Sequence, residues 1–368
     1  VLDRFPRVDY ASCPVDADGW GNLAFPNGVK KSTECRVPIL HYAVLTLGYF
    51  LFSDRFRDGL RLYATFLTFD VPQHLSNPSG DYLPKCICLI SHYPQFRVFK
   101  QCITEIYQTA CSQDELTWDI PLERFIAQLV GEVPVPIVGL YSVEWTNSLT
   151  SQSRVHCTLP SVRHPLTSDF YLSFTFDLLS LNTILAIFAS MITERRILFY
   201  SHSLSTLTIV CQTFLQLLQP FQWLFPYIPL LPEKILDVYT DSRPYIIGID
   251  AQHLHAIDHT QTVLSIMRPL QDGLLMVNLD LDSFSCSQLI TRLPPPFGDK
   301  LFHRLCQAKQ TRASQRDIVD ELRPADFDEV SSKRFDIEVY QCFMEFYADI
   351  CRGFRQFIFF FDDEPFFN

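Results

Sequence analysis

The sequence predicts an α/β fold in two parts followed by a helical segment, and three patterns in the 368-residue chain carry that prediction. Short apolar runs that are rich in β-branched and aromatic residues come first and predict strands, and two runs at helical spacing follow them. After residue 180, short apolar runs alternate with helical patterns, which is typical of a largely parallel sheet covered on both faces. Hydrophobic residues make up 48% of the chain and charged residues 19%, a balance that favours a buried core over disorder.

The first part reads as a small α+β domain that ends near residue 147. It opens with turn signals at Asp18-Gly19 and Asn27-Gly28. Strands are predicted at residues 39–46, 61–69 and 86–91, and helices at 96–110 and 120–129. The polar stretch 146–169 has the composition of an interdomain linker.

The second part alternates helices and strands and is followed by a charged stretch and a final helix. Helices are predicted at 181–195, 203–218 and 233–238, and strands at 197–200, 227–231, 245–249 and 274–280. The charged residues 306–334 are expected to be loosely ordered. The last segment carries an apolar helical stripe at Ile337, Tyr340, Phe343, Tyr347, Ile350 and Phe354.

Composition argues against several classes of partner. The formal net charge is −11 and no run of Lys or Arg is present, so neither a nucleic-acid interface nor a basic membrane anchor is expected. The longest apolar stretch, 174–193, contains Asp177 and Asn182, so we read it as core rather than as a membrane span. The twelve cysteines lack the paired spacing of zinc ligands, which favours reduced thiols in a cytosolic protein.

The motifs of common catalytic sites are absent from the sequence. It has no G-x-x-x-x-G-K-[ST] phosphate loop, no G-x-G-x-x-G after a strand, no G-x-S-x-G and no H-E-x-x-H. A cluster at His253, His255, Asp258 and His259 offers metal-ligating groups, but a polar surface loop is the favoured interpretation. We therefore expect no catalytic residue, metal or cofactor, and an α/β enzyme that uses this cluster is the less favoured alternative.

Residues 190–250 resemble the central segment of DENN domains over their whole length. The matching pieces, in order, are TERRILF at 193–199, SLSTLT at 203–208, PFQW at 220–223, YIPLLP at 227–232, LD at 236–237 and PYIIG at 244–248. Residues 4–6 and 86–99 are similar to the upstream part of the module, and residues 343–356 to the start of its downstream helical part. So many pieces in the same order make a chance match improbable.

The resemblance implies a domain plan. It places an upstream, longin-like lobe at 1–147, a central α/β DENN lobe with a mostly parallel sheet at 165–300, and a truncated downstream helical segment at 330–368. The chain is then expected to be a piece of a longer protein. Leu224, Phe225 and the segment 241–243 depart from the usual family residues, and because they fall in loops they bear on the choice of partner.

The same resemblance implies a function without chemical catalysis. DENN proteins promote exchange of GDP for GTP on Rab-family small GTPases in vesicle trafficking, so a Rab is the expected partner. The expected location is the cytoplasm, with recruitment to vesicle or endosomal membranes through that partner. A non-catalytic DENN scaffold that binds a GTPase or another protein is the alternative.

The GTPase is expected to contact residues near the boundary of the two lobes. Several aromatic residues of this set also fit a role in packing, and Gly248 fits a close approach of two backbones on the central strand. The candidate contact residues are Pro94, Phe96, Phe99, Trp223, Phe225, Tyr227, Asp237, Tyr239, Asp241, Arg243, Pro244 and Tyr245.

Overall fold

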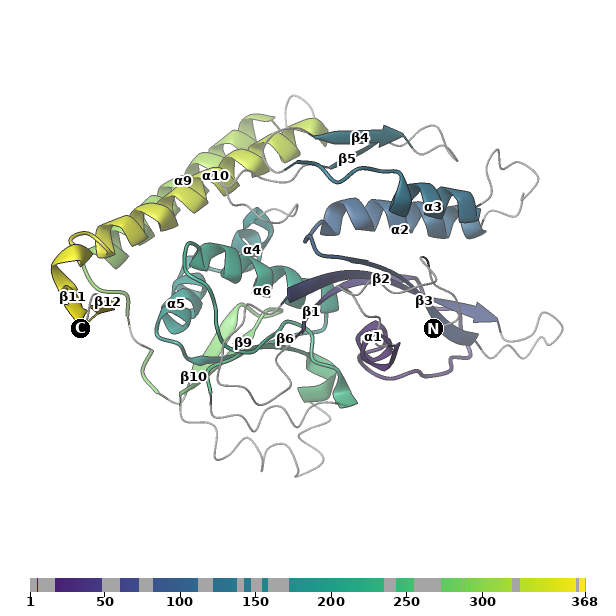
Figure 1. Ribbon diagram of the computed structural model, residues 1–368, viewed down its shortest axis with the longest axis horizontal. Helices are drawn as coiled ribbons and strands as arrows, with labels where there is room; N and C mark the ends of the chain where they lie inside the picture. Colours follow the sequence, from purple (N-terminus) through teal and green to yellow (C-terminus); the bar gives the residue numbers. More distant parts are fainter. Residues whose placement is uncertain are drawn as a thin grey trace. The chain divides into compact units, whose positions relative to one another are not determined.

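The chain forms two compact units (Figure 1). The computed structural model describes residues 5, 17–47, 60–72, 82–111, 122–137, 142–146, 154–157, 172–234, 243–254, 273–286, 288–290, 292–319, 325–361 and 364–367. The first unit consists of Val1–Phe170, Glu194–Gln216 and Trp223–Gln288. The second unit consists of Tyr171–Thr193, Leu217–Gln222 and Leu289–Asn368.

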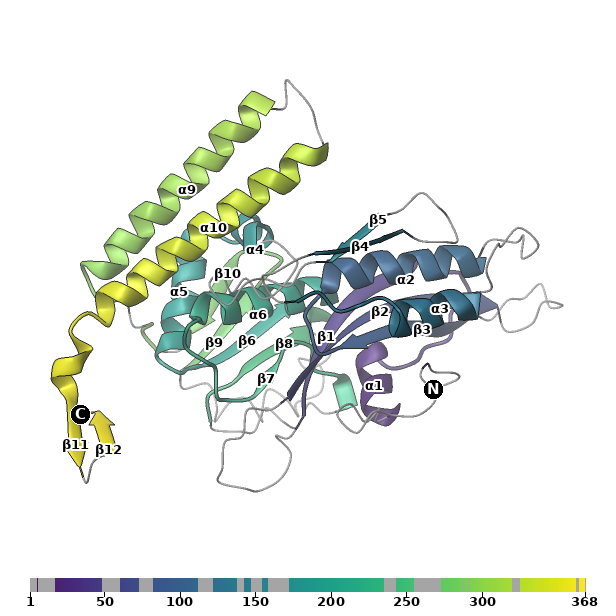
Figure 2. The same cartoon turned by 45° about the horizontal axis from the view of Figure 1, so that its top comes forward.

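A three-stranded antiparallel sheet begins the first unit. Helices α2 and α3 cover one face and α1 the other (Figures 1 and 2). Successive side chains of β2 point to opposite faces of this sheet. Phe66 therefore contacts Trp20 of α1 on one face, and Tyr63 contacts Phe96 of α2 on the other. The elements are α1 (Ala17–Ala24), β1 (Ile39–Leu47), β2 (Leu60–Pro72), β3 (Tyr82–Ser91), α2 (Phe96–Cys111) and α3 (Leu122–Gly131).

Two expectations for this part of the chain are wrong. Asp18-Gly19 is not a turn but lies within α1, because burial of Trp20 and Leu23 against the sheet outweighs the weak helix propensity of glycine. The expected linker, 146–169, includes the strand β5 (Arg154–Cys157), which pairs with β4 (Val143–Thr146) just before it. Val155 of that hairpin is fully buried against α2, a contact that its polar neighbours in the sequence conceal.

The first unit also contains a five-stranded sheet in the order β10-β9-β6-β8-β7. Strand β6 pairs in parallel with β8 on one side and β9 on the other, and only β10 is antiparallel. Helix α6 (Leu204–Leu218) follows β6 and packs on it through Phe214 and Phe199. The predicted mixed α/β class with a largely parallel sheet is confirmed. The strands are β6 (Arg196–Ser201), β7 (Tyr227–Ile228), β8 (Ile246–Asp250), β9 (Leu274–Asn278) and β10 (Ser283–Cys286).

The second unit is mainly helical. Its two long helices, α9 and α10, run antiparallel, as the ion pairs Lys300–Asp349 and Arg304–Glu345 between their ends require. Helix α10 packs on α5 through Phe343 and Phe188, whose ring centroids are 4.7 Å apart. The elements are α4 (Leu172–Leu178), α5 (Leu181–Ile192), α9 (Phe297–Val319), α10 (Ala325–Ile350), η4 (Phe354–Phe357), β11 (Ile358–Phe361) and β12 (Glu364–Phe367).

The prediction that residues 306–334 are loosely ordered is wrong, since α9 runs to Val319 and α10 begins at Ala325. The apolar stripe of α10 is confirmed at Tyr340, Phe343 and Tyr347, which are buried. It is wrong at Ile337 and Ile350, which are 46% and 40% exposed, and at Phe354, which is exposed and lies in η4 beyond the helix. In the part of the chain that the structure describes, no single helix has the length and hydropathy of a membrane span. Only the bent pair α4 and α5, taken together, meets both criteria.

Candidate functional site

Tyr227, one of the predicted contact residues, is the centre of a buried polar network. Its hydroxyl donates a hydrogen bond of 3.0 Å to the Oε1 atom of Gln212. The Gln212 side chain also forms a hydrogen bond with the side chain of Tyr63. The Arg61 guanidinium lies 5.4 Å from the centre of the Tyr227 ring, within the range of a cation–π contact. Burial raises the pKa of the Tyr227 phenol well above its usual value, so the hydroxyl stays protonated and acts as a donor.

Phe96, a second predicted contact residue, extends this network into the antiparallel sheet. Its ring lies 4.9 Å from that of Tyr42 and 5.9 Å from that of Tyr63. Tyr42 is also linked to α6, because the Thr208 hydroxyl of that helix donates a 2.7 Å hydrogen bond to the carbonyl oxygen of Tyr42. These contacts join β1, β2 and α2 to α6 and β7. We call the group the aromatic junction, and it consists of Tyr42, Tyr63, Phe96, Gln212 and Tyr227.

The loop before β7 is held by its own side chains. The Trp223 indole donates to the carbonyl oxygen of Pro226 over 3.3 Å, and its ring lies 5.4 Å from that of Phe225. The Ile246 amide donates to the same carbonyl, which ties the loop to the start of β8. Trp223 and Tyr245 are almost fully buried, and Tyr245 belongs to the core of the parallel sheet. These two residues therefore position the loop rather than present themselves to a partner.

The remaining candidates divide into exposed and buried groups. Arg243 is exposed, and Phe225 and Pro244 are half-buried, so a partner protein can reach them. Phe99 packs instead with Val98, Cys102 and Val155, so the structure does not bring it together with the junction. Pro94 is buried. Asp237, Tyr239 and Asp241 lie outside the described residues.

The sequence interpretation missed the partners that hold the motif residues in place. Arg61 and Tyr63 alternate along β2, which placed them on one face of a predicted strand but gave no indication of what covers that face. Gln212 is buried in the apolar helix α6, and a polar residue on such a face is the signal that a hydrogen-bond partner is required.

His253, the first residue of the cluster that we interpreted as a polar surface loop rather than a metal site, is instead buried in a short helical turn and has a structural role. Its Nε2 atom lies 2.6 Å from the Oδ1 atom of Asn27, and the Nδ2 atom of Asn27 donates to the Asp250 carboxylate over 2.7 Å. Because Asn27 Oδ1 can only accept, His253 Nε2 carries the proton and has no lone pair for a metal. His255, Asp258 and His259 lie outside the described residues, and among the residues described no group of three possible ligands could hold a metal ion.

With this geometry established, comparison with known proteins identifies the family. The family model described as DENN (AEX-3) domain matches residues 82–281, more than half of the chain. The chain belongs to the DENN family. The DENN match begins at β3 and takes in α2, α6 and the strands from β6 to β9, so it includes Phe96, Gln212 and Tyr227 of the aromatic junction.

A plant relative carries the same domain. The Arabidopsis thaliana protein "DENN domain and WD repeat-containing protein SCD1" is 28% identical over an alignment 388 residues long, and that alignment covers 97% of this DENN chain. The chain spans 30% of the length of that relative. DENN domains are generally linked to nucleotide exchange on Rab GTPases and are typically regulators rather than chemical catalysts.

Proposed function

We propose that this chain is a guanine nucleotide exchange factor that promotes release of GDP from a Rab-family small GTPase. The observation that carries the proposal is the DENN match over residues 82–281. An exchange factor needs no acid, base or cofactor. It binds the nucleotide-free or switch-open GTPase more tightly than the GDP-bound form, and that difference in affinity raises the rate of GDP release.

The proposed contact surface surrounds the loop before β7 and the start of β8. Phe225, Arg243 and Pro244 meet the GTPase, together with Asp237, Tyr239 and Asp241. Among the described residues, the buried Trp223, Tyr227 and Tyr245 hold the loop before β7 and the start of β8 in place. Phe96 joins them to the antiparallel sheet through Tyr63, and Pro94, which precedes α2, is buried. Such a preformed surface lowers the entropy lost when a partner binds. Phe99 packs with Val98, Cys102 and Val155, in the cluster that joins α2 to β5.

The alternative function is a DENN scaffold that binds a GTPase without speeding exchange. Both functions use the same surface, so the difference lies in which nucleotide state is bound more tightly. For either function we place the protein in the cytoplasm and on vesicle or endosomal membranes. The net charge of −11 favours recruitment there by the GTPase rather than by anionic lipid.

Release of a fluorescent GDP analogue from a panel of purified Rab proteins tests the proposed function. We expect catalytic amounts of the chain to accelerate release from one Rab or a small group of them. If the chain binds a Rab but leaves its release rate unchanged, the scaffold function is correct. If it neither binds nor accelerates release from any Rab, both functions are wrong.

Substitutions on the proposed surface test its location. We expect Arg243→Glu and Phe225→Ala each to slow the stimulated release by about tenfold, because charge reversal at an interface impairs association and removal of an aromatic side chain reduces contact area. Arg124→Glu, at an exposed position of α3, is the matched control. It should stimulate GDP release from the Rab at the wild-type rate. If both surface variants keep the wild-type melting temperature and stimulate GDP release from the Rab at the wild-type rate, these two residues do not belong to the contact surface.

A further inference from the structure

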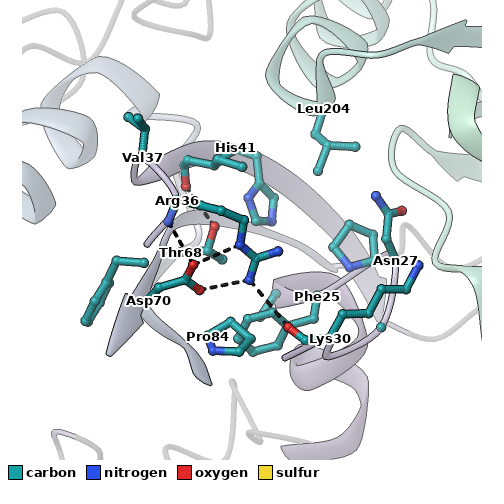
Figure 3. Close-up of a pocket in the computed structure, with 15 residues that line it drawn as sticks. Phe25, Asn27, Lys30, Arg36, Val37, His41, Thr68, Asp70, Pro84 and Leu204 are labelled. Atoms are coloured by element: carbon teal, nitrogen blue, oxygen red, sulfur yellow. Dashed lines mark hydrogen bonds and ion pairs between the residues drawn. The ribbon is translucent and has the colours of Figure 1, made fainter. Parts of the chain in front are cut away.

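The first unit contains a cavity of about 130 Å³ that none of the candidate GTPase-contact residues lines. Its walls come from the turn after α1, the segment that leads into β1, the start of β1, the end of β2, the start of β3 and the first residue of α6 (Figure 3). They include Phe25, Ile39, Asp70, Pro84 and Leu204. The cavity is thus a feature of the DENN chain that the proposed exchange surface does not use.

Size and lining suit one apolar side chain. A cavity on the order of 150 Å³ accepts a benzene ring. Phe25, Pro84 and Leu204 supply apolar walls, and Val37 and Ile39, which also line the cavity, are 82% and 54% exposed. Apolar side chains that line a cavity and remain exposed gain free energy when a ligand covers them.

A cationic group at the cavity is held in a fixed orientation. The Arg36 Nε atom donates to Asp70 Oδ2 and its Nη2 atom to Asp70 Oδ1, each over 2.8 Å, and Nη2 also contacts the carbonyl oxygen of Lys30 (Figure 3). The Asp70 carboxylate is 3% exposed, and its pKa lies below the usual value because Arg36 donates to it. In the described part of the chain, Arg36 Nη1 has no partner and Lys30 pairs with no acidic side chain. Both groups are therefore available to an anion.

The local charge is opposite to that of the whole chain. Residues 30–36 contain Lys30, Lys31 and Arg36 but only one acidic residue, Glu34, in a chain whose net charge is −11. A positive segment beside an apolar cavity favours a ligand that combines an apolar group with carboxylates.

His41 contributes a buried, neutral imidazole to the cavity wall. Its Nε2 atom donates to the carbonyl oxygen of Leu23 over 3.0 Å, which leaves Nδ1 as a buried acceptor without a partner among the described residues. Burial lowers the pKa of the imidazole to about 4, so Nδ1 remains unprotonated at neutral pH. Because Nδ1 itself is buried, it is the aromatic ring of a tyrosine, and not a hydrogen bond to His41, that suits this residue to the apolar walls of the cavity.

We infer that this cavity is a docking site for an acidic peptide segment of a partner protein. The segment inserts one aromatic side chain between Phe25, Pro84 and Leu204 and sets a carboxylate against Lys30 and Arg36. This peptide docking is separate from nucleotide exchange, because it uses a different surface.

Fluorescence anisotropy with short labelled peptides tests the inference. The probe has a central tyrosine flanked by glutamates, and two comparison peptides replace the tyrosine by alanine or the glutamates by lysines. Lys30→Glu and Val37→Asp alter exposed positions at the cavity. Their matched controls are Lys100→Glu on α2 and Val135→Asp, at a valine that is 60% exposed. Melting temperatures of all four variants verify that they are folded.

We expect the tyrosine–glutamate peptide to bind the wild-type chain and both controls with the same Kd. Each cavity variant should weaken binding by about tenfold or more, and added salt should weaken it further. Three results would each overturn the inference: no saturable binding of this probe at millimolar concentration, equal binding of the alanine or lysine peptide, or equal affinity of the cavity variants and their controls.

Discussion

Gly248 fixes the distance between β8 and the chain segment beside it. A Cβ atom at this position would lie 2.1 Å from the carbonyl oxygen of Pro229, and the Leu231 amide donates a 2.8 Å hydrogen bond to the carbonyl oxygen of Gly248. The close backbone approach expected from the sequence is thereby confirmed. Only glycine allows the segment that follows β7 to bond to the centre of β8.

Gly248→Ala should therefore destabilise the first unit by about 1–3 kcal/mol, because the neighbouring atom belongs to the backbone and cannot rotate away. Gly21→Ala in α1 is the control, since nothing lies within 4 Å of its added Cβ and alanine is a better helix former. Urea unfolding followed by tryptophan fluorescence measures both. Equal stability of the two variants would contradict the packing argument.

Asp336 is a buried carboxyl group in the second unit. It is 4% exposed, and its Oδ1 atom accepts a 2.9 Å hydrogen bond from the amide of Ser173. Burial raises the pKa of Asp336 to about 7, against weaker opposing effects of that hydrogen bond and of Arg312. Arg312 makes its own ion pair with Asp177, so it compensates the Asp336 charge only in part.

The raised pKa of Asp336 predicts in which direction the folding stability changes with pH. The folded form binds the proton more tightly than the unfolded chain, so this contribution to stability is complete below pH ~4 and is lost as the pH rises to about 7. Asp336→Asn keeps the acceptor and removes the titration, so it should abolish this loss and raise stability at pH 8 relative to wild type.

Unfolding followed by circular dichroism at several pH values checks the Asp336 prediction, with Asp299→Asn at an exposed position of α9 as the control. If the difference in stability between Asp336→Asn and wild type does not change between pH 4 and 8, the predicted titration is wrong.

Among the elements, α9 shows why charge content alone is a poor guide to order. Among the side chains of α9 whose burial the structure describes, the buried ones are Leu301, Leu305, Ala308 and Arg312, spaced by four, three and four residues. This stripe is narrow, and the charged residues around it led to the prediction of a loose segment. Lys300 and Arg304, which precede that segment on α9, pair with α10, and Arg312 within the segment pairs with Asp177. Charged residues here therefore stabilise the helices instead of disordering them.

The packing of α10 on α5 is expected to carry much of the stability of the second unit. Phe343→Ala should cost about 3–5 kcal/mol, because the ring is fully buried and faces Phe188 edge-on. Ile337→Ala on the same helix should cost under about 1 kcal/mol, because that side chain is 46% exposed. Thermal unfolding at 222 nm compares the two, and similar losses would mean that the helix face is assigned wrongly.

At the scale of the whole molecule, the sequence predicted the strands and helices better than the contacts between them. The apolar runs of β6, β8 and β9 specified a parallel sheet, and the motif residues included Tyr227 and Phe96. The side chains that connect those two, Tyr63 and Gln212, come from segments far apart in the chain, so no local pattern could pair them. The predicted domain boundaries, 1–147, 165–300 and 330–368, stay a prediction.

The exchange function predicts that the chain itself binds neither GDP nor GTP. The sequence contains no glycine-rich phosphate loop before a helix, the feature that cradles phosphates in nucleotide-binding proteins. Titration calorimetry with both nucleotides should show no saturable heat. Binding with a micromolar Kd would contradict the prediction and favour a nucleotide-dependent enzyme.

The central claim is that this DENN chain distinguishes the nucleotide states of its GTPase. The most direct measurement is the affinity of the chain for one Rab in the nucleotide-free and the GDP-bound form, determined side by side by surface-immobilised binding. An exchange factor must bind the nucleotide-free form more tightly, and we expect a difference of about a hundredfold or more. Equal affinity for the two forms would contradict the account, because a partner that binds both states equally shifts no equilibrium between them.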